Sequence, residues 1–187
     1  MSDIRIEHLD DEQLPAARKL VWRVFRWQTI AERFSFWAIA NRRFRFVRRL
    51  MAWHGVADFL DLWAAIDGET GNLVGTTGLY VCTHDAAEAV WLAWFCVAPE
   101  ARRQGIGSRL LDFSIDQARR TGRQYLRLYT SNRQNEAAAQ VLYESRDLTV
   151  VRKKRHLFYT TIYRELALDP AATWKTAEKV DGGSEIE

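Results

Sequence analysis

The stretch RRQGIGSRLL (residues 102–111) follows an apolar run, VWLAWFCVAP (residues 90–99), and this order predicts a strand, then a glycine loop, then the start of a helix. Two glycines one residue apart let the main chain turn tightly and approach a ligand with no side chain between them. The N–H groups that begin the following helix are unpaired and carry partial positive charge. Arg102 and Arg103 add forked donors. The pattern therefore predicts a site for a phosphate-bearing ligand, most simply a pyrophosphate.

The same pattern also fits a tight structural connection between a strand and a helix. No GxxxxGK[ST] motif occurs in the chain, which argues against a nucleotide triphosphatase. Leu110 stands where GxGxxG would need its last glycine, which argues against dinucleotide binding. Taken alone, the motif leaves both a phosphate site and a structural turn open.

Composition indicates one globular domain with an uneven charge distribution. Of the 187 residues, 48% are apolar and 27% are charged. The acidic N-terminus lacks a signal-like apolar run and no stretch is long enough to span a membrane, so we expect a cytoplasmic protein. Cys82 and Cys96 lack metal-ligand spacing, and we expect reduced thiols and no metal. Residues 15–54 contain ten basic residues and one acid, Glu32.

Hydrophobic periodicity and turn residues predict an α+β fold, a mixed sheet with helices on both faces. The expected helices cover a segment that begins at Asp10 or Asp11 and carries Pro15, then 31–51, 108–121 and 135–145. The expected strands cover 4–7, 61–66, 73–82, 88–97, 125–130, 148–152 and 157–166. A helical crossover between 88–97 and 125–130 favours parallel pairing of those strands. We expect one domain over 1–168 and a flexible tail over 169–187.

The stretch from Leu92 to Phe113 resembles the signature of the GNAT superfamily of N-acetyltransferases. Residues 102–107 match the family's Arg/Gln-x-x-Gly-x-Gly/Ala motif, which wraps the pyrophosphate of acetyl-coenzyme A. Residues 125–129 are similar to the family's fifth strand. Residues 139–144 are similar to its next helix, with Tyr143 in the usual place of a tyrosine. The resemblance covers about 60–166, and before that it rests on element order alone.

The resemblance implies a mostly antiparallel seven-stranded sheet that is splayed between the fourth and fifth strands. It also implies that acetyl-coenzyme A is the acetyl donor and that a primary amine of a small molecule or protein attacks its thioester directly. The implied cofactor contacts are Phe95, Cys96, Val97, Arg102, Arg103, Gln104, Gly105, Ile106, Gly107, Ser108 and Asn135. Two features depart from the family pattern. Glu136 replaces the asparagine expected seven residues before Tyr143, and Asp147-Leu148 replaces a Gly-Phe pair.

The resemblance implies that Tyr143 protonates the leaving thiolate. For the base that accepts the amine's proton, Glu88 is the only carboxylate in the strand 88–97, and His84 and His54 are the further candidates. Water, without a protein base, is another candidate acceptor of this proton. Cys96 is expected to be a small buried hydrophobe and not an acyl carrier. Because no acid follows Glu88 in this strand, a catalytically silent module that senses acyl-coenzyme A is the alternative function.

The basic segment 15–54 also contains nine aromatic residues, and its position corresponds to the acceptor side in the family. It either binds an acidic or aromatic acceptor, or contacts nucleic acid or an anionic membrane surface, or packs into the core and a homodimer interface. Nucleic acid is the less favoured partner. The positive charge argues against polyamine acceptors.

Overall fold

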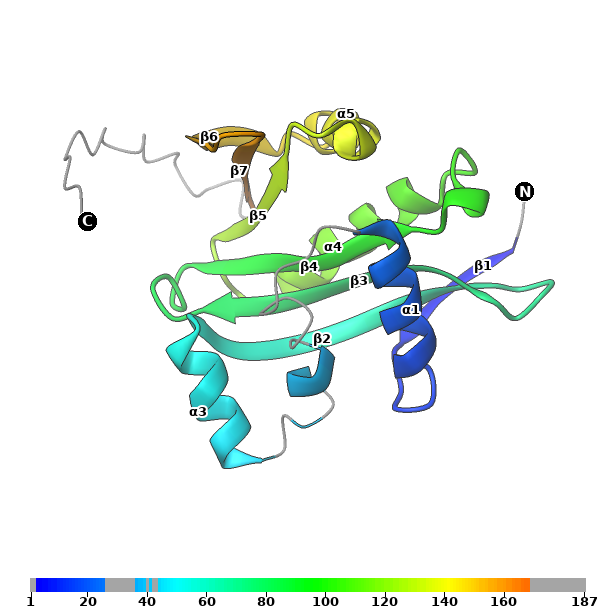
Figure 1. Ribbon diagram of the computed structural model, residues 1–187, viewed down its shortest axis with the longest axis horizontal. Coiled ribbons are helices and arrows are strands. Elements are labelled where there is room, and N and C mark those ends of the chain that lie inside the picture. The colour runs from blue at the N-terminus through cyan, green and yellow to red at the C-terminus, as the bar shows by residue number, and fades with distance from the viewer. Residues whose placement is uncertain (1–2, 26–35, 40, 42–43, 169–187) are drawn as a thin grey trace.

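A computed structural model of the chain describes residues 3–25, 36–39, 41 and 44–168, and its centre is one seven-stranded sheet (Figure 1). The strands lie in the order β1-β2-β3-β4-β5-β7-β6. Their bounds are β1 Ile4–His8, β2 Val56–Asp67, β3 Leu73–Cys82, β4 Ala89–Val97, β5 Tyr125–Ser131, β6 Thr149–Arg155 and β7 Thr160–Ala167. All neighbours are antiparallel except β4 and β5. This confirms the predicted mixed, mostly antiparallel sheet.

Helices cover both faces of the sheet, with α1 in front of the middle strands and α4 behind them in the view of Figure 1. The helices are α1 Leu14–Val24, α3 Arg45–Trp53, α4 Ile106–Arg120 and α5 Ala137–Glu144, with 3-10 turns at Pro99–Ala101 and Gln134–Glu136. Each long helix buries one apolar face, as its periodicity predicted. In α1 the buried residues are Ala17, Leu20 and Val21. In α4 they include Leu110, Leu111 and Ile115.

The single helix expected over 31–51 is interrupted. Residues 36–39 are helical, but Phe44 has an extended backbone (φ −84°, ψ 128°), so α3 begins only at Arg45. Val47 and Met51 then pack inward, and Gly55, at φ +83°, ends the segment. Residues 31–35 lie outside the described residues, as does the predicted tail 169–187.

The sheet opens between β4 and β5. These strands pair in parallel only at Ala89–Tyr125, Val90–Leu126 and Trp91–Arg127. Beyond that point β5 continues alongside β7 as far as Ser131, while β4 follows β3. A bulge in β4 strengthens the divergence, because the register with β3 shifts beyond Ala93 and Trp94 adopts a positive φ of 47°. The predicted splay between the fourth and fifth strands is confirmed.

A cluster of charges fastens the joined end of these strands. The Arg127 guanidinium on β5 contacts carboxylate oxygens of Asp85 at 2.7 Å, Glu88 at 2.7 Å and Glu165 at 2.6 Å. These carboxylates raise the pKa of Arg127 further above its usual value, against an opposing effect of burial. The indole of Trp91 also donates to Asp85. Because the cluster holds β4, β5 and β7 together here, the strands part only toward their carboxyl ends.

Within the part of the chain that the structure describes, no helix combines the length and apolar character needed to cross a bilayer.

Candidate active site

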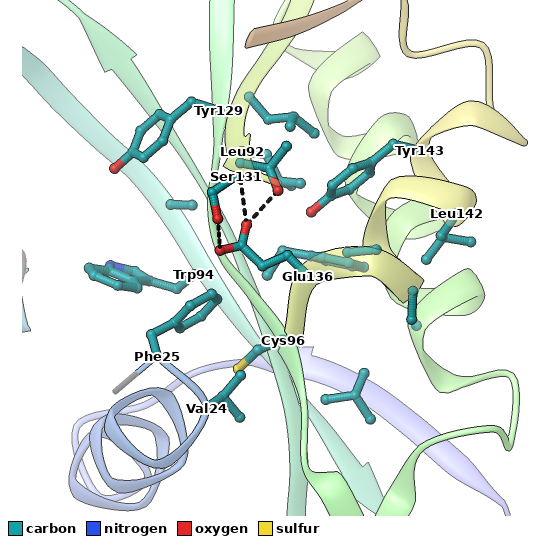
Figure 2. Close-up of a pocket in the computed structure, with 18 of the residues that line it drawn as sticks. Val24, Phe25, Leu92, Trp94, Cys96, Tyr129, Ser131, Glu136, Leu142 and Tyr143 are labelled. Atoms are coloured by element: carbon teal, nitrogen blue, oxygen red, sulfur yellow. Dashed lines mark hydrogen bonds between the residues drawn. The ribbon is translucent and has the colours of Figure 1, made fainter. Parts of the chain in front are cut away.

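A cleft of about 1710 Å³ occupies the space opened by the splay. One end is bordered by the loop before α4 and by α5, and the other by the end of α1 and by the α3–β2 connection. Figure 2 shows the middle of this cleft, where Tyr143 and Glu136, seven residues apart in the sequence, come together with Cys96 of β4. The volume suits a ligand of cofactor size together with a second reactant.

The glycine loop shapes the first end. Gly105 has a left-handed backbone (φ +78°) at the cap position of α4, and Arg103 before it also has a positive φ of 64°. A Cβ built on Gly105 would meet nothing within 4 Å, and one on Gly107 would meet only Leu142 at 3.5 Å and Val97 at 3.8 Å. The loop is therefore open in front of its main chain. Arg102 is fixed against the end of β4, because its Nε donates to the Val97 carbonyl at 3.3 Å.

The amides of this loop are available to a ligand. Within the described residues, the N–H groups of Gly105, Ile106, Gly107 and Ser108 have no hydrogen-bond acceptor, and the first helical bond is Arg109 N–H to the Gly105 carbonyl at 3.1 Å. Together with Arg102 and Arg103 they line the cleft, whereas Gln104 is not among its lining residues. Four unpaired amides and two guanidinium groups form an anion site.

The end of β4 forms one wall of the cleft, the β4 wall, and its main chain faces the cleft where β4 and β5 have parted. Phe95, Cys96 and Val97 line the cleft. Cys96 itself turns into the core, where its Sγ lies 3.3 Å from the Thr76 hydroxyl. Burial raises the pKa of the Cys96 thiol to about 11. The thiol is therefore held protonated in the core, as expected for a small buried hydrophobe.

Tyr143 on α5 faces the β4 wall. Its ring lies 5.8 Å from that of Phe95, measured between ring centroids, and the residue is 6% exposed. Within the described residues its hydroxyl has no hydrogen-bond partner, and Figure 2 shows it directed into the cleft on the side of Glu136. Burial, reinforced by the charge of Glu136, raises the pKa of Tyr143. The phenol therefore keeps its proton at neutral pH and is a potential proton donor.

Glu136 supplies the only carboxylate among the described lining residues. It accepts hydrogen bonds from the Thr130 hydroxyl at 2.5 Å, the Ser131 amide at 2.8 Å and the Ser131 hydroxyl at 2.7 Å (Figure 2). A carboxylate has about four lone-pair positions, so roughly one is left to face the cleft. Sequence reasoning noted Glu136 only as a departure from the family. Its partners on β5 were the signal that was missed.

Of the other residues predicted for the site, some line the cleft and some lie outside it. Asn135 lines the cleft beside Glu136, with its side chain exposed. Glu88 does not: it lies at the joined end of β4, where its carboxylate pairs with Arg127. This placement gives no support to Glu88 as the base among the candidates from the sequence. His84 also lies outside the lining, near Asp85, and only His54 of the two histidines borders the cleft.

Three potential metal ligands come together near the joined end of β4. Single ligand atoms of Cys82, His84 and Asp85 lie within 4.8 Å of one another. Asp85, however, already accepts from the Trp91 indole and pairs with the Arg127 guanidinium. Burial also raises the pKa of Cys82 to about 11. An adjacent cation and a protonated thiol both oppose metal binding, so we assign no metal site here.

The second end of the cleft is aromatic. Trp94, on the β4 bulge, contacts the rings of Phe25 and Phe36 at centroid distances of 6.2 and 5.3 Å. Phe59 and Tyr80 form another pair at 5.8 Å. No carboxylate among the described residues borders this end. The arrangement favours a reactant with an apolar body over one with several positive charges.

Residues 59–147 match the family model described as acetyltransferase (GNAT) domain. No curated protein sequence matches the chain.

Solved structures resemble the whole fold. The ribosomal-protein-S18-alanine N-acetyltransferase from Escherichia coli is 21% identical, with 91% of this chain and 97% of that one covered at a TM-score of 0.65. An N-acetyltransferase from Staphylococcus aureus Mu50 is 17% identical, with 90% and 100% covered at 0.66. The yncA protein from Salmonella typhimurium, solved with its cofactor acetyl-coenzyme A, is 19% identical, with 91% and 97% covered at 0.65. At these identities the likeness concerns the fold.

Proposed function

Because residues 59–147 match the model of the GNAT acetyltransferase domain, we propose that the chain transfers an acetyl group from acetyl-coenzyme A to a primary amine by direct attack on the thioester. One observation carries the proposal most strongly. The unpaired amides of residues 105–108 and the buried, unpartnered hydroxyl of Tyr143 border the same cleft between parted strands. The first feature suits a diphosphate, and the second suits a leaving thiolate.

In this proposal the cofactor's diphosphate lies against the amides that begin α4, and Arg102 and Arg103 neutralise its charge. The pantetheine arm then runs along the exposed main chain of β4 at Phe95–Val97, where β5 no longer occupies the pairing edge. Such a segment adds to the sheet as a short extra strand would. The likeness to a fold solved with acetyl-coenzyme A supports this placement.

The reaction needs a donor for the oxyanion, an acid for the leaving thiolate and a base for the amine. The neutral amine nitrogen attacks the thioester carbonyl carbon, and a main-chain N–H at the β4 bulge stabilises the oxyanion that forms. The carbon–sulfur bond then breaks, and the thiolate takes the proton of Tyr143. Tyr143 is reprotonated as the amine's own proton is passed on. The products are the acetylated amine and free coenzyme A.

We assign the acceptance of the amine's proton to Glu136, acting through water. Glu136 borders the cleft beside Tyr143 and keeps roughly one lone-pair position unused. Glu88 and His84, the candidates from the sequence, lie outside the cleft lining. His54 borders the cleft at the acceptor end and is the comparison residue for this assignment.

For the acceptor we propose a primary amine on an apolar or aromatic body. The rings of Phe25, Phe59, Tyr80 and Trp94 border the end of the cleft where the acceptor would enter. A small molecule and the terminus of a peptide both satisfy this description.

The test is the release of free thiol by purified protein with acetyl-coenzyme A and a panel of amines. The panel contains aromatic amines, peptides with apolar first residues and a polyamine. We expect turnover with the first two groups and little with the polyamine. Tight cofactor binding without thiol release on any acceptor would instead support the silent sensing module.

A further inference from the structure

The outer surface of α3 carries apolar side chains that the core does not use. Val47 and Met51 face inward, which leaves Phe46, Leu50 and Trp53 along the outer side at helical spacing. Phe46 is 62% exposed and Trp53 is 82% exposed. Large aromatic side chains this exposed on one helix indicate a surface that binds something.

Arginines flank this stripe. Arg45, Arg48 and Arg49 are exposed on α3, and none of the three forms an ion pair within the described chain. Residues 33–57 contain six arginines and no acidic residue. The surface is thus both apolar and uniformly positive.

The turn between β6 and β7 repeats this combination. Leu157 and Phe158 stand at its tip with 87% and 88% exposure. The four residues that lead to it, Arg152–Arg155, are all basic, and residues 148–164 contain no acid. The turn is therefore a second exposed apolar element with a cationic base.

Both elements border the mouth of the same cleft. His54 and Gly55, which follow α3, line it from one side, and Tyr159 and Thr161, which follow the turn, line it from the other. In Figure 1, α3 and the end of β6 lie toward the same side of the molecule. A single extended partner can therefore contact both.

We propose that α3 and the β6–β7 turn form a docking surface for a lipid bilayer that contains anionic lipids. Phe46, Leu50, Trp53, Leu157 and Phe158 enter the interface, and the neighbouring arginines and lysines stay at the level of the headgroups. This is the arrangement by which basic amphipathic elements lie on membranes without crossing them. Tryptophan is favoured at that level because its ring is apolar and its N–H is polar.

The other occupants fit less well. A second copy of this surface would bring arginine against arginine, which disfavours self-association through it. A nucleic acid would satisfy the cations, but Leu50 and Leu157 offer no aromatic face on which bases stack. A surface that combines aliphatic and aromatic side chains is better suited to the hydrocarbon region of a bilayer.

Docking would place the mouth of the cleft at the membrane. If the proposed function holds, the acceptor amine is then presented at the membrane surface, on a molecule with an apolar body. The docking itself does not depend on catalysis, so it can be tested on the protein without a turnover assay.

The test is co-sedimentation with vesicles of phosphatidylcholine alone and of equal parts phosphatidylcholine and phosphatidylglycerol. We expect binding to the anionic vesicles only, and its loss at about 0.5 M salt, where charges are screened within a few ångströms. The double variant Trp53→Ser/Phe158→Ser should bind at least about tenfold more weakly. The triple variant Arg45→Gln/Arg48→Gln/Arg49→Gln should bind roughly 10²-fold more weakly, from about fivefold per charge.

The matched control is Arg119→Gln/Arg120→Gln, which removes two exposed cations from the end of α4. It should bind anionic vesicles within about twofold of the parent, because these residues lie outside the docking surface. Thermal unfolding of every variant checks that the fold is intact. A failure of the proposed acetyl transfer would leave all these binding results unchanged.

Three results would overturn the proposal. The first is the absence of binding to anionic vesicles, or binding that the serine and glutamine variants leave unaltered. The second is tighter binding to a single-stranded RNA oligonucleotide with the same sensitivity to these variants, which would assign the surface to nucleic acid. The third is a lipid-free dimer that Trp53→Ser/Phe158→Ser converts to a monomer.

Discussion

Substitution of Gly107 separates the role of the main-chain amides from the stability of the fold. Gly107 is the second residue of α4, and its φ is not positive. A Cβ there would make ordinary van der Waals contacts with Leu142 at 3.5 Å and Val97 at 3.8 Å. Side chains at this position therefore fit the fold, and replacing glycine near the start of a helix should stabilise it by up to about 1 kcal/mol.

Gly107→Asp and Gly107→Asn have nearly the same shape and differ by one negative charge. If the amides of residues 105–108 hold a diphosphate, the aspartate lies within about 5 Å of it. At an effective dielectric constant of about 20 the repulsion is then roughly 3 kcal/mol. Acetyl-coenzyme A should therefore bind the aspartate variant about 10²-fold more weakly than the asparagine variant.

Isothermal titration calorimetry of the parent and both variants measures this difference, and thermal unfolding verifies that each is folded. The gap between aspartate and asparagine should shrink as salt is raised, because the repulsion is screened. Equal affinities of the two variants for acetyl-coenzyme A would contradict the proposed diphosphate site, since the charge would then lie far from the phosphates.

Four further predictions concern the residues around the cleft and the sheet. Tyr143→Phe should lower kcat about 10²-fold with little change in acetyl-coenzyme A affinity, because the phenol acts on the leaving group; equal rates in variant and parent would remove its role as acid. Glu136→Gln should lower kcat at least about tenfold and alter the acid limb of the pH–rate profile, whereas His54→Gln should stay within about threefold of the parent; the reverse order would move the proton acceptor to His54. Arg127→Met should reduce the free energy of unfolding by about 3–5 kcal/mol, as urea denaturation would show, because it leaves buried carboxylates unpaired, and a loss below about 1 kcal/mol would contradict this account of the cluster. For Cys96 the folded-state pKa of about 11 lies above the ordinary 9.0, so its contribution to stability is complete below pH 9 and is lost as the pH rises toward 11; Cys96→Ala should flatten this fall, and an unchanged slope would count against the buried thiol.

Much of the sheet could be predicted because its signals are local. The glycine-rich turn at 67–72 separates β2 from β3, and Pro99 follows the end of β4. A helix between β4 and β5 requires a crossover, which makes their pairing parallel. The glycine loop and Tyr143 were recognised from short motifs. Their joint presence at one cleft depends on the splay that the family resemblance implied.

The parts that escaped prediction depend on long-range or single-residue effects. Glu88 is a candidate base from the sequence of its strand alone, whereas its partner Arg127 lies 39 positions further along the chain and gives no local signal. The break at Phe44 follows from one extended residue within an otherwise helical pattern. Glu136 could not be singled out from the sequence, because its position is fixed by two hydroxyls and one amide that donate to it at the end of β5.

The proposed function depends above all on the amides at the start of α4 holding the diphosphate of acetyl-coenzyme A. The most direct test is a titration of ¹⁵N-labelled protein with acetyl-coenzyme A, observed through the backbone amide resonances. We predict large downfield proton shifts at Gly105, Ile106, Gly107 and Ser108, because their N–H groups exchange water for phosphate oxygens. Saturable binding that leaves these four resonances in place, while amides elsewhere move, would contradict the claim.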